Sequence, residues 1–271
     1  MPLFSFFKRF SKLFKTVPPV HKLGVSYSVW DGEEMLEFAI RSIRSEVDYV
    51  NVVWQKLSWF GTMCSDELEP TLERLKNEGL IDELIFFTPD LKAIPAENEA
   101  KKRNMGLKAA RKAGCTHFIN LDTDELFDTN EFKEAKEIVY RFHLTHTACP
   151  VVTYFSPTVR LVNGCTGATL PFICSIENGE EIVLNAHQPW YADPTRKIPV
   201  TKKSNPFFLH SICMHHFPKC RYDLKKKIEN STMKQTPEGK KALETLENLD
   251  MDDMLQKGVC VKVENKFHLP F

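Results

Sequence analysis

Apolar and polar residues form two kinds of block along the first half of the chain. Four short apolar runs have the length of buried strands, at 22–29, 49–54, 84–87 and 118–122. The intervals between them carry apolar residues three and four positions apart, which predicts helices at 33–44, 67–78 and 97–113. Strands that alternate with helices predict a mostly parallel sheet with flanking crossover helices. The expected fold class is therefore α/β.

The second half has a different texture, beginning with a predicted helix at 130–143. Strand-like segments follow at 149–155, 158–162, 171–176 and 181–184, with Asn-Gly turns at 163–164 and 178–179. A helix from 236 to about 255 and a strand-like segment at 259–263 come last. We therefore expect a mixed region after the parallel half, and three parts in all: a leader and linker at 1–20, one domain at 21–235, and a C-terminal helix and tail at 236–271.

The leader has its own pattern. Between 1 and 15, apolar residues recur at helical spacing, basic residues fill the other face, and no acidic residue occurs. A basic amphipathic helix is typical of a membrane surface, where anionic lipids attract it. A helix docked on the domain and an unstructured leader are the alternatives, and Pro18-Pro19 is the predicted linker.

Composition narrows the classes of function. Lys+Arg and Asp+Glu number 36 each among 271 residues, so no overall charge selects a nucleic acid. No apolar run reaches the ~20 residues of a membrane-spanning helix. The eight cysteines include no Cys-x-x-Cys pair, and no signal peptide is visible, so we expect reduced thiols in a cytoplasmic protein. If the leader binds lipid, the protein would be peripheral at the inner face of the membrane. Dinucleotide, P-loop and Gly-x-Ser-x-Gly motifs are absent.

The strand at 118–122 runs directly into acidic residues, in the sequence Asp122-Thr123-Asp124. Because side chains alternate along a strand, we expect both aspartates to leave its end on the same side. Carboxylates at a strand end suit Mg²⁺ or Mn²⁺, which takes part of its coordination shell from substrate phosphates. An acidic turn without a metal is the alternative interpretation.

The stretch around these acids resembles family 2-like glycosyltransferases of the GT-A fold. In that group an Arg-Asn-x-Gly helix, here at Arg103 and Asn104, precedes a strand that ends in Asp-x-Asp. The resemblance implies that Asp122 and Asp124 hold Mn²⁺ or Mg²⁺ on the diphosphate of a nucleotide-sugar donor, and that the two helix residues help to bind this donor.

The first strand also resembles the opening of these transferases, where an aromatic-Asn-Gly-Glu sequence lines the nucleobase pocket. Here the sequence is Trp30-Asp31-Gly32-Glu33, with Asp31 in place of the asparagine. The family places an acidic pair after the second strand to bind uracil and ribose, whereas this chain has Gln55-Lys56. An amide both donates and accepts hydrogen bonds, so Gln55 remains a candidate for a base edge.

A second informative stretch contains His215, His216 and Arg221 and then a basic helix. The resemblance makes one histidine the third metal ligand and places Arg221 with Lys225, Lys226 or Lys227 on the leaving diphosphate. We choose His216 as the ligand and Lys225 as the donor-binding lysine. A zinc site from Cys213, His215, His216 and Cys220 is the alternative, disfavoured because four such closely spaced ligands hardly surround one ion.

The expected activity is transfer of a sugar from a nucleoside-diphosphate sugar, UDP-linked by expectation, to a hydroxyl acceptor on a cell-surface or lipid-linked glycan. If the reaction inverts the configuration at the transferred sugar carbon, a carboxylate must deprotonate the acceptor hydroxyl. The candidates are Asp193, Glu177, Glu180 and Glu181, and we choose Asp193. A turn stabilised by its own backbone bonds is the alternative role for Asp193. Rival functions are a phage-type sugar transferase acting on hydroxymethylated DNA bases and a nucleotidyltransferase-like module.

Overall fold

The structure of the chain is a computed structural model that describes residues 21–162, 169–235, 237–248 and 250–271. The predicted leader and linker at 1–20 and the Asn-Gly turn at 163–164 lie outside the described residues. Within those ranges no helix has the length and apolar character needed to span a membrane.

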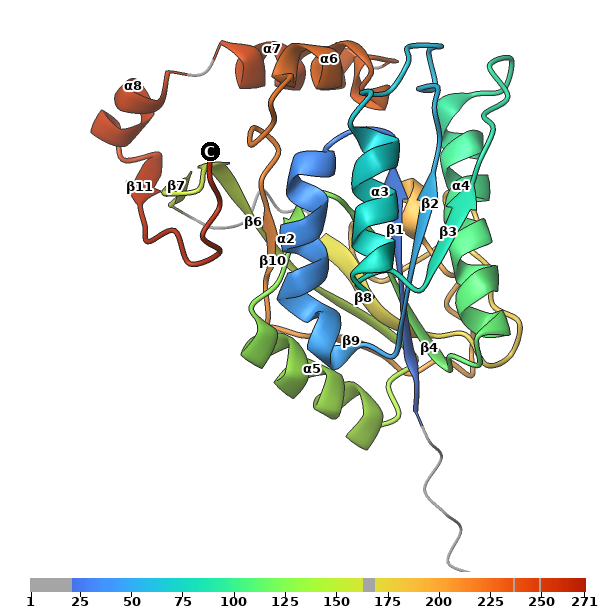
Figure 1. The fold of residues 1–271 in the computed structure, drawn as a ribbon. Coiled ribbons are helices and arrows are strands. Elements are labelled where there is room, and N and C mark those ends of the chain that lie inside the picture. The colour runs from blue at the N-terminus through green and yellow to red at the C-terminus, as the bar shows by residue number, and fades with distance from the viewer. Residues whose placement is uncertain (1–20, 163–168, 236, 249) are drawn as a thin grey trace, which may run out of the picture.

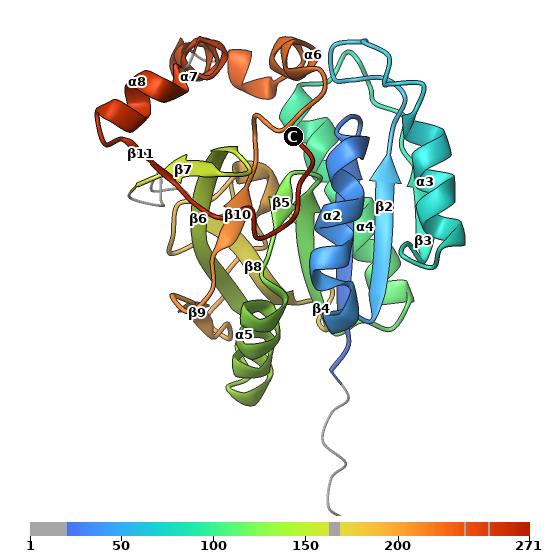
Figure 2. The ribbon, with the colours of Figure 1, turned by 60° about the vertical axis from the view of Figure 1, so that its left-hand side comes forward.

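The parallel half of the sheet is confirmed. Four strands lie side by side in the order β4-β1-β2-β3 and all run parallel: β1 (Leu23–Val29), β2 (Tyr49–Trp54), β3 (Glu83–Phe86) and β4 (His117–Asp122). Three helices make the crossovers: α2 (Glu33–Ile43), α3 (Leu68–Asn77) and α4 (Pro95–Lys112). Figures 1 and 2 show α2 and α4 on opposite faces of this sheet, which buries β1 almost completely.

The mixed region extends the same sheet beyond β4. β8 (Thr169–Ser175) pairs antiparallel with β4 and with β6 (His146–Ser156), and β7 (Val159–Leu161) and β11 (Cys260–Lys262) continue the order outward. α5 (Thr129–Arg141) leads into β6 and is capped by the Asp128 side chain. The predicted α/β class with a mixed second region is therefore confirmed.

The predicted strand at 181–184 is wrong. The N–H and C=O of Ile182 are both bound by the side-chain amide of Asn104, each at 2.8 Å, and the N–H of Val183 donates to Lys197 O. Because a helix side chain and a neighbouring loop satisfy these backbone groups, the segment has no strand partner and runs as a loop.

The C-terminal segment crosses the molecule and returns to the sheet. After α6 (Leu224–Glu229) and the short turn η4 (Thr232–Gln235), the single helix expected at 236–255 is instead two, α7 (Pro237–Glu247) and α8 (Met251–Gln256). These helices lie along the edge of the molecule opposite to the one where the chain enters β1 (Figure 1). Leu269 is buried in the main core.

Three very short strands complete the sheet and bear on the site. β5 (Glu125–Leu126) pairs antiparallel with β10 (Met214–His216), and β10 in turn runs parallel to β6. β9 (Pro206–Phe208) pairs with the start of β6. The pairing of β5 with β10 brings the late histidines to the end of β4.

Gly106 of α4 provides a test of the close packing between this helix and the sheet. A Cβ at this position would overlap Ser26 Oγ and lie 2.6 Å from Ser26 Cβ on β1. We expect Gly106→Ala to lower the free energy of unfolding, because overpacking costs about 1–3 kcal/mol while alanine gains only about 1 kcal/mol in helix propensity. Urea denaturation measures this change. Lys101→Ala, an exposed substitution on the same helix, is the control, and a Gly106→Ala protein as stable as wild type would contradict the packing.

Candidate functional site

The candidate site lies at the carboxyl ends of β1 and β4, beneath the segment that leads into α6. The chain leaves β1 through Gly32, which has a left-handed φ of 79°, and leaves β4 through a turn at Thr123 and Asp124. The Thr123 hydroxyl donates to Asp31 O (3.5 Å), so the two exits touch. Ligands of open α/β sheets collect at such an edge.

Asp124 is the centre of this edge. Its carboxylate is almost fully buried, and one oxygen, Oδ2, lies 2.6 Å from Lys227 Nζ, 3.0 Å from Arg221 Nη2 and 3.7 Å from His216 Nε2. Burial alone would raise its pKa, but Lys227, Arg221 and His216 hold the pKa of Asp124 well below the ordinary value. The group is therefore a carboxylate at neutral pH, and the two predicted motifs meet on it.

Asp122 has a separate set of cationic partners. Its carboxylate pairs with Arg103 Nη2 (3.2 Å) from α4 and with Arg196 from the short turn η3 (Pro194–Arg196). Burial opposes ionisation, yet the two guanidinium groups lower the pKa of Asp122. Strand alternation ends at Asp122, because Thr123 and Asp124 form a turn. For this reason the two carboxylates contact different side chains, although they remain close enough to repel each other.

The structure distinguishes the two adjacent histidines. His216 lies opposite Glu125 in the β10–β5 register and faces Asp124. His215 points the other way, where its Nδ1 contacts the hydroxyl of Tyr154 at 3.0 Å and burial, followed by Lys266, lowers its pKa to about 3. This is the arrangement expected of neighbours on an extended segment.

Arg221 packs directly against Gly32. Its side chain is 5% exposed, Nη2 holds Asp124, and Nε and Nη1 are buried without a hydrogen-bond partner. A Cβ at Gly32 would overlap Nη1. The glycine therefore serves both the turn after β1 and the approach of this guanidinium.

Lys227, not Lys225, is the lysine of α6 that reaches the site. Asp223 caps the helix by accepting from Lys226 N (2.8 Å), and this start places Lys227 toward Asp124. Lys225 lies on the outer side, 78% exposed and 4.0 Å from Glu229. Lys226 lies over the Trp30 ring at 5.3 Å, so Trp30 contacts the same helix.

Asp193 occupies two roles at once. Its Oδ1 accepts from Thr195 N and Thr195 Oγ1 at 2.8 Å each, which is the expected turn, while Oδ2 lies 3.5 Å from Arg196 Nε and 3.9 Å from Arg103 Nη2. The structure thus brings Asp193 to the carboxylate edge. The other candidate bases are elsewhere: Glu181 pairs with Lys108 near the C-terminal half of α4, and Glu177 and Glu180 lie in the same loop.

The remaining predicted donor-binding residues have structural contacts. Both polar ends of the Asn104 side chain are used by Ile182, as described above. Gln55 is fully buried at the end of β2, with its Nε2 donating to Leu57 O (2.7 Å) and its Oε1 unpaired. Arg103 is fully buried and also bonds to Asn120 and Glu99.

The sequence did not single out Lys102 as a site residue. This lysine is 2% exposed, donates to Val29 O (2.8 Å) at the end of β1, and lies over the Trp59 ring. Burial and then the neighbouring Arg103 lower its pKa to about 7. Its only signal in sequence is its position beside Arg103.

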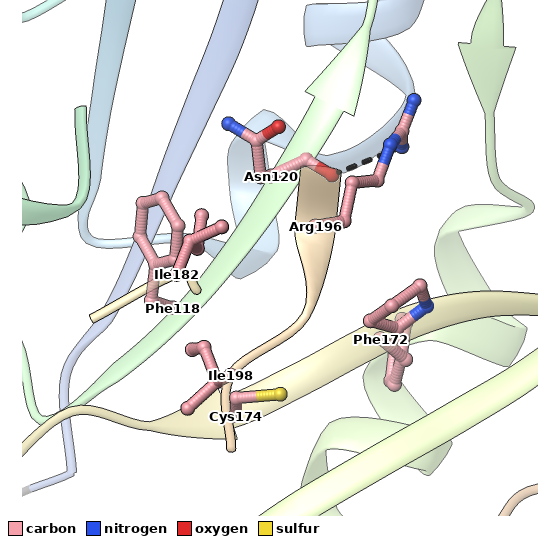
Figure 3. A pocket seen from close by; sticks show the side chains of 8 residues that line it. Phe118, Asn120, Phe172, Cys174, Ile182, Arg196 and Ile198 are labelled. Carbon is pink, nitrogen blue, oxygen red and sulfur yellow. Dashed lines mark hydrogen bonds between the residues drawn. The ribbon is translucent and has the colours of Figure 1, made fainter. Parts of the chain in front are cut away.

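Two cavities adjoin these residues. The larger, about 460 Å³, lies between α2, α3 and the segment 221–226, and we call it the α2–α3 cleft. Its walls include Asp31, Gly32 and Arg221, and its volume is in the range of small-molecule sites. The smaller cavity lies behind Arg196, where the guanidinium donates to Asn120 O (Figure 3). At about 10 Å³ it holds at most a water molecule.

The described residues contain no group of three or more His, Cys, Asp or Glu side chains placed to hold a metal ion by themselves. Asp124 and His216 form a pair, and Asp122 is held by arginines.

No family model and no curated protein matches this chain. Among solved structures, it is similar to the crystal structure of S. aureus TarS, with 14% identity, a TM-score of 0.42, and coverage of 88% of this chain but 42% of that one. It is also similar to TarS 1–349 in complex with UDP-GlcNAc, with 13% identity, a TM-score of 0.37, and coverage of 70% and 59%. This chain thus spans less than half of the longer TarS chain. Likeness at this level does not establish a shared activity.

Gly32→Ala tests the packing of Arg221, with Gly79→Ala as a matched control. Both glycines have positive φ, 79° and 75°, but a Cβ at Gly79 meets nothing within 4 Å. Each variant should lose about 1–2 kcal/mol to left-handed strain. Gly32→Ala should lose roughly 3 kcal/mol more in urea denaturation, because it displaces Arg221 from a buried ion pair. Equal losses in the two variants would contradict this contact.

Proposed function

We propose that this chain is a glycosyltransferase that uses a nucleotide sugar and transfers the sugar to a hydroxyl group. The observation that carries the proposal is the convergence on Asp124 of Lys227, Arg221 and His216, at the carboxyl end of β4. Cations gathered around a carboxylate at a sheet edge are suited to a departing diphosphate, whose charge they stabilise.

The diphosphate is proposed to bind at Arg221 and Lys227. Both cations share the same oxygen of Asp124, so a phosphate group beside that oxygen lies within reach of both. Two buried nitrogens of Arg221, Nε and Nη1, have no hydrogen-bond partner among the described residues, and a phosphate could accept charge-assisted hydrogen bonds from them. Arg221 is accordingly the proposed catalytic cation.

Mn²⁺ or Mg²⁺ is the proposed cofactor, with Asp124 and His216 as the protein ligands that face each other. Asp122, the third predicted ligand, would have to leave its arginine partners to join them. Asp124 Oδ2 and His216 Nε2, oxygen and nitrogen donors 3.7 Å apart, have the chemistry that such a site needs. These ions are often bound through one or two carboxylates together with substrate phosphates. An incomplete protein shell therefore fits an ion that binds with the donor. When bound, such an ion would neutralise negative charge on the leaving diphosphate.

The nucleoside is proposed to enter the α2–α3 cleft, which begins at Asp31 and Arg221. The carboxylates of Asp31, Glu33 and Glu67 line this cleft and form no ion pair or hydrogen bond within the part of the chain that is described. They are available to accept hydrogen bonds from ribose hydroxyls and base N–H groups. Trp30 lies next to this wall in sequence, and its ring is covered by Lys226, which lines the cleft.

The sugar and the acceptor are proposed to lie on the opposite flank, toward Asp122 and Asp193. Asp193 is partly exposed, and its Oδ2 lies near Arg196 and Arg103 but accepts no hydrogen bond from the described residues. We therefore assign to Asp193 the removal of the proton from the acceptor hydroxyl. Arg103 and Arg196 hold this flank in place. A glycan of the cell surface or linked to lipid is the proposed acceptor, supported by the predicted leader. UDP-GlcNAc, bound in one TarS structure, is the first donor to test.

Asp124→Asn should abolish the effect of Mn²⁺ on UDP binding. Wild-type protein is expected to bind UDP at least about tenfold more tightly with Mn²⁺, the size of effect known for metal-site residues. The variant lacks the charge that pairs with the ion, so its affinity should not respond. Isothermal titration with and without Mn²⁺ measures this, and circular dichroism checks the fold. The exposed Asp252→Asn is the control, and an unchanged Mn²⁺ response in Asp124→Asn would remove the assignment.

His216→Ala and His215→Ala should have different effects. His216→Ala is expected to weaken Mn²⁺-dependent UDP binding and the turnover of UDP-GlcNAc together, with little change in stability. His215→Ala should mainly lower the free energy of unfolding, by about 1–3 kcal/mol, because Tyr154 loses a buried hydrogen-bond partner. Titration and urea denaturation of both variants separate the two cases. Full activity in both would rule out His216 as a ligand.

A further inference from the structure

The segment from Gln188 to Arg196 is fixed along its length. The Gln188 amide donates to Ile198 O at 3.1 Å and accepts from Trp190 Nε1 at 3.1 Å. The Thr169 hydroxyl donates to the carbonyl of Tyr191, and a β-bridge joins Thr169 to the next residue. The segment then ends in the Asp193 turn and Arg196, which hold the carboxylate edge.

Tyr191 is the exception in this fixed segment. Its backbone is held, but the side chain is 78% exposed. Within the described ranges its ring packs on no other ring and its hydroxyl makes no hydrogen bond. Tyr222 is equally exposed, at 79%, yet its ring packs against Phe271 at 5.3 Å. Tyr191 thus presents an aromatic surface whose ring and hydroxyl have no partner among the described residues.

This surface lies beside Asp193. The segment is extended here, and exposure alternates along it: Tyr191 is exposed, Ala192 is 3% exposed, and the Asp193 side chain is 39% exposed. Residues two apart on an extended segment project to the same side, about 7 Å apart. The ring and the carboxylate proposed to accept the hydroxyl proton therefore share one face.

We infer that Tyr191 is the acceptor platform, and that it stacks against the apolar face of a pyranose ring in a neutral glycan. The inference rests on the proposed function and names the substrate class of the same site. A ring held at Tyr191 would place a hydroxyl of the same or the next sugar at Asp193. A rigid tyrosine provides large contact area at low entropic cost.

The surrounding charges favour a glycan over DNA. A duplex needs a continuous row of cations for its phosphates. In the described part of α6, Lys226 faces Trp30 and Lys227 faces Asp124, which leaves Lys225 as the exposed lysine. The basic stretch seen in the sequence is therefore divided among separate contacts.

The test uses the full chain saturated with UDP and Mn²⁺, with maltotriose and N,N′-diacetylchitobiose as neutral probes and a short DNA duplex as the rival. Saturation-transfer NMR should detect at least one of the two glycans on wild type. Tyr191→Ala should weaken that binding about tenfold or more, whereas Tyr191→Phe should retain it because the ring remains. Phe142→Ala removes an aromatic that is 59% exposed at a distant position and is the matched control.

Several results would overturn the inference. These are no binding of either glycan by wild type, equal binding by Tyr191→Ala and wild type, equal loss in Phe142→Ala, or Tyr191-dependent binding of the DNA duplex. Affinity for UDP is measured in the same samples. If the wild-type protein did not bind UDP, the proposed function itself would be contradicted. If it bound UDP and bound the glycan equally well without the Tyr191 ring, only the role of Tyr191 would be contradicted.

Discussion

The buried carboxylate of Asp124 is the interaction on which the arrangement of the site depends. A charged group out of water is costly unless it is paired, and Asp124 is paired with groups up to 103 residues further along the chain. The pairing of β5 with β10 and the cap at Asp223 bring those groups into reach. Under the proposed function, an anion arriving at this low-dielectric position would meet the same cations that stabilise Asp124. Fold stability and ligand binding would then use the same contacts.

Carboxylates and cations are closely paired at the carboxylate edge. Asp122, Asp124 and Asp193 are each held by side chains from Arg103, Arg196, Arg221 or Lys227. Under the proposed function, a diphosphate at this edge would compete with these carboxylates for the same cations. A divalent ion bound with the diphosphate would offset part of the added negative charge.

Much of the parallel half was predictable, because buried strands and amphipathic helices leave strong periodic patterns. The opposite orientations of His215 and His216 also followed from strand alternation, whereas the turn at Thr123 and Asp124 ends that alternation. That Lys227 is the lysine of α6 that reaches the site could not be predicted, because the direction of each side chain on a short helix depends on where the helix begins. Here the helix begins at the Asp223 cap. The segment 181–184 has a strand-like sequence, but the side chain of Asn104 binds its backbone and it runs as a loop. Lys102 is a buried cation, and no local pattern marks a charge whose partners come from distant segments.

The ring contact of Phe271 affects how the protein can be handled. Phe271 packs its ring against Tyr222, which lines the α2–α3 cleft. A label or fusion attached at Phe271 would begin beside the cleft and disturb that ring contact. Attachment for binding measurements therefore belongs at an exposed position outside this cleft.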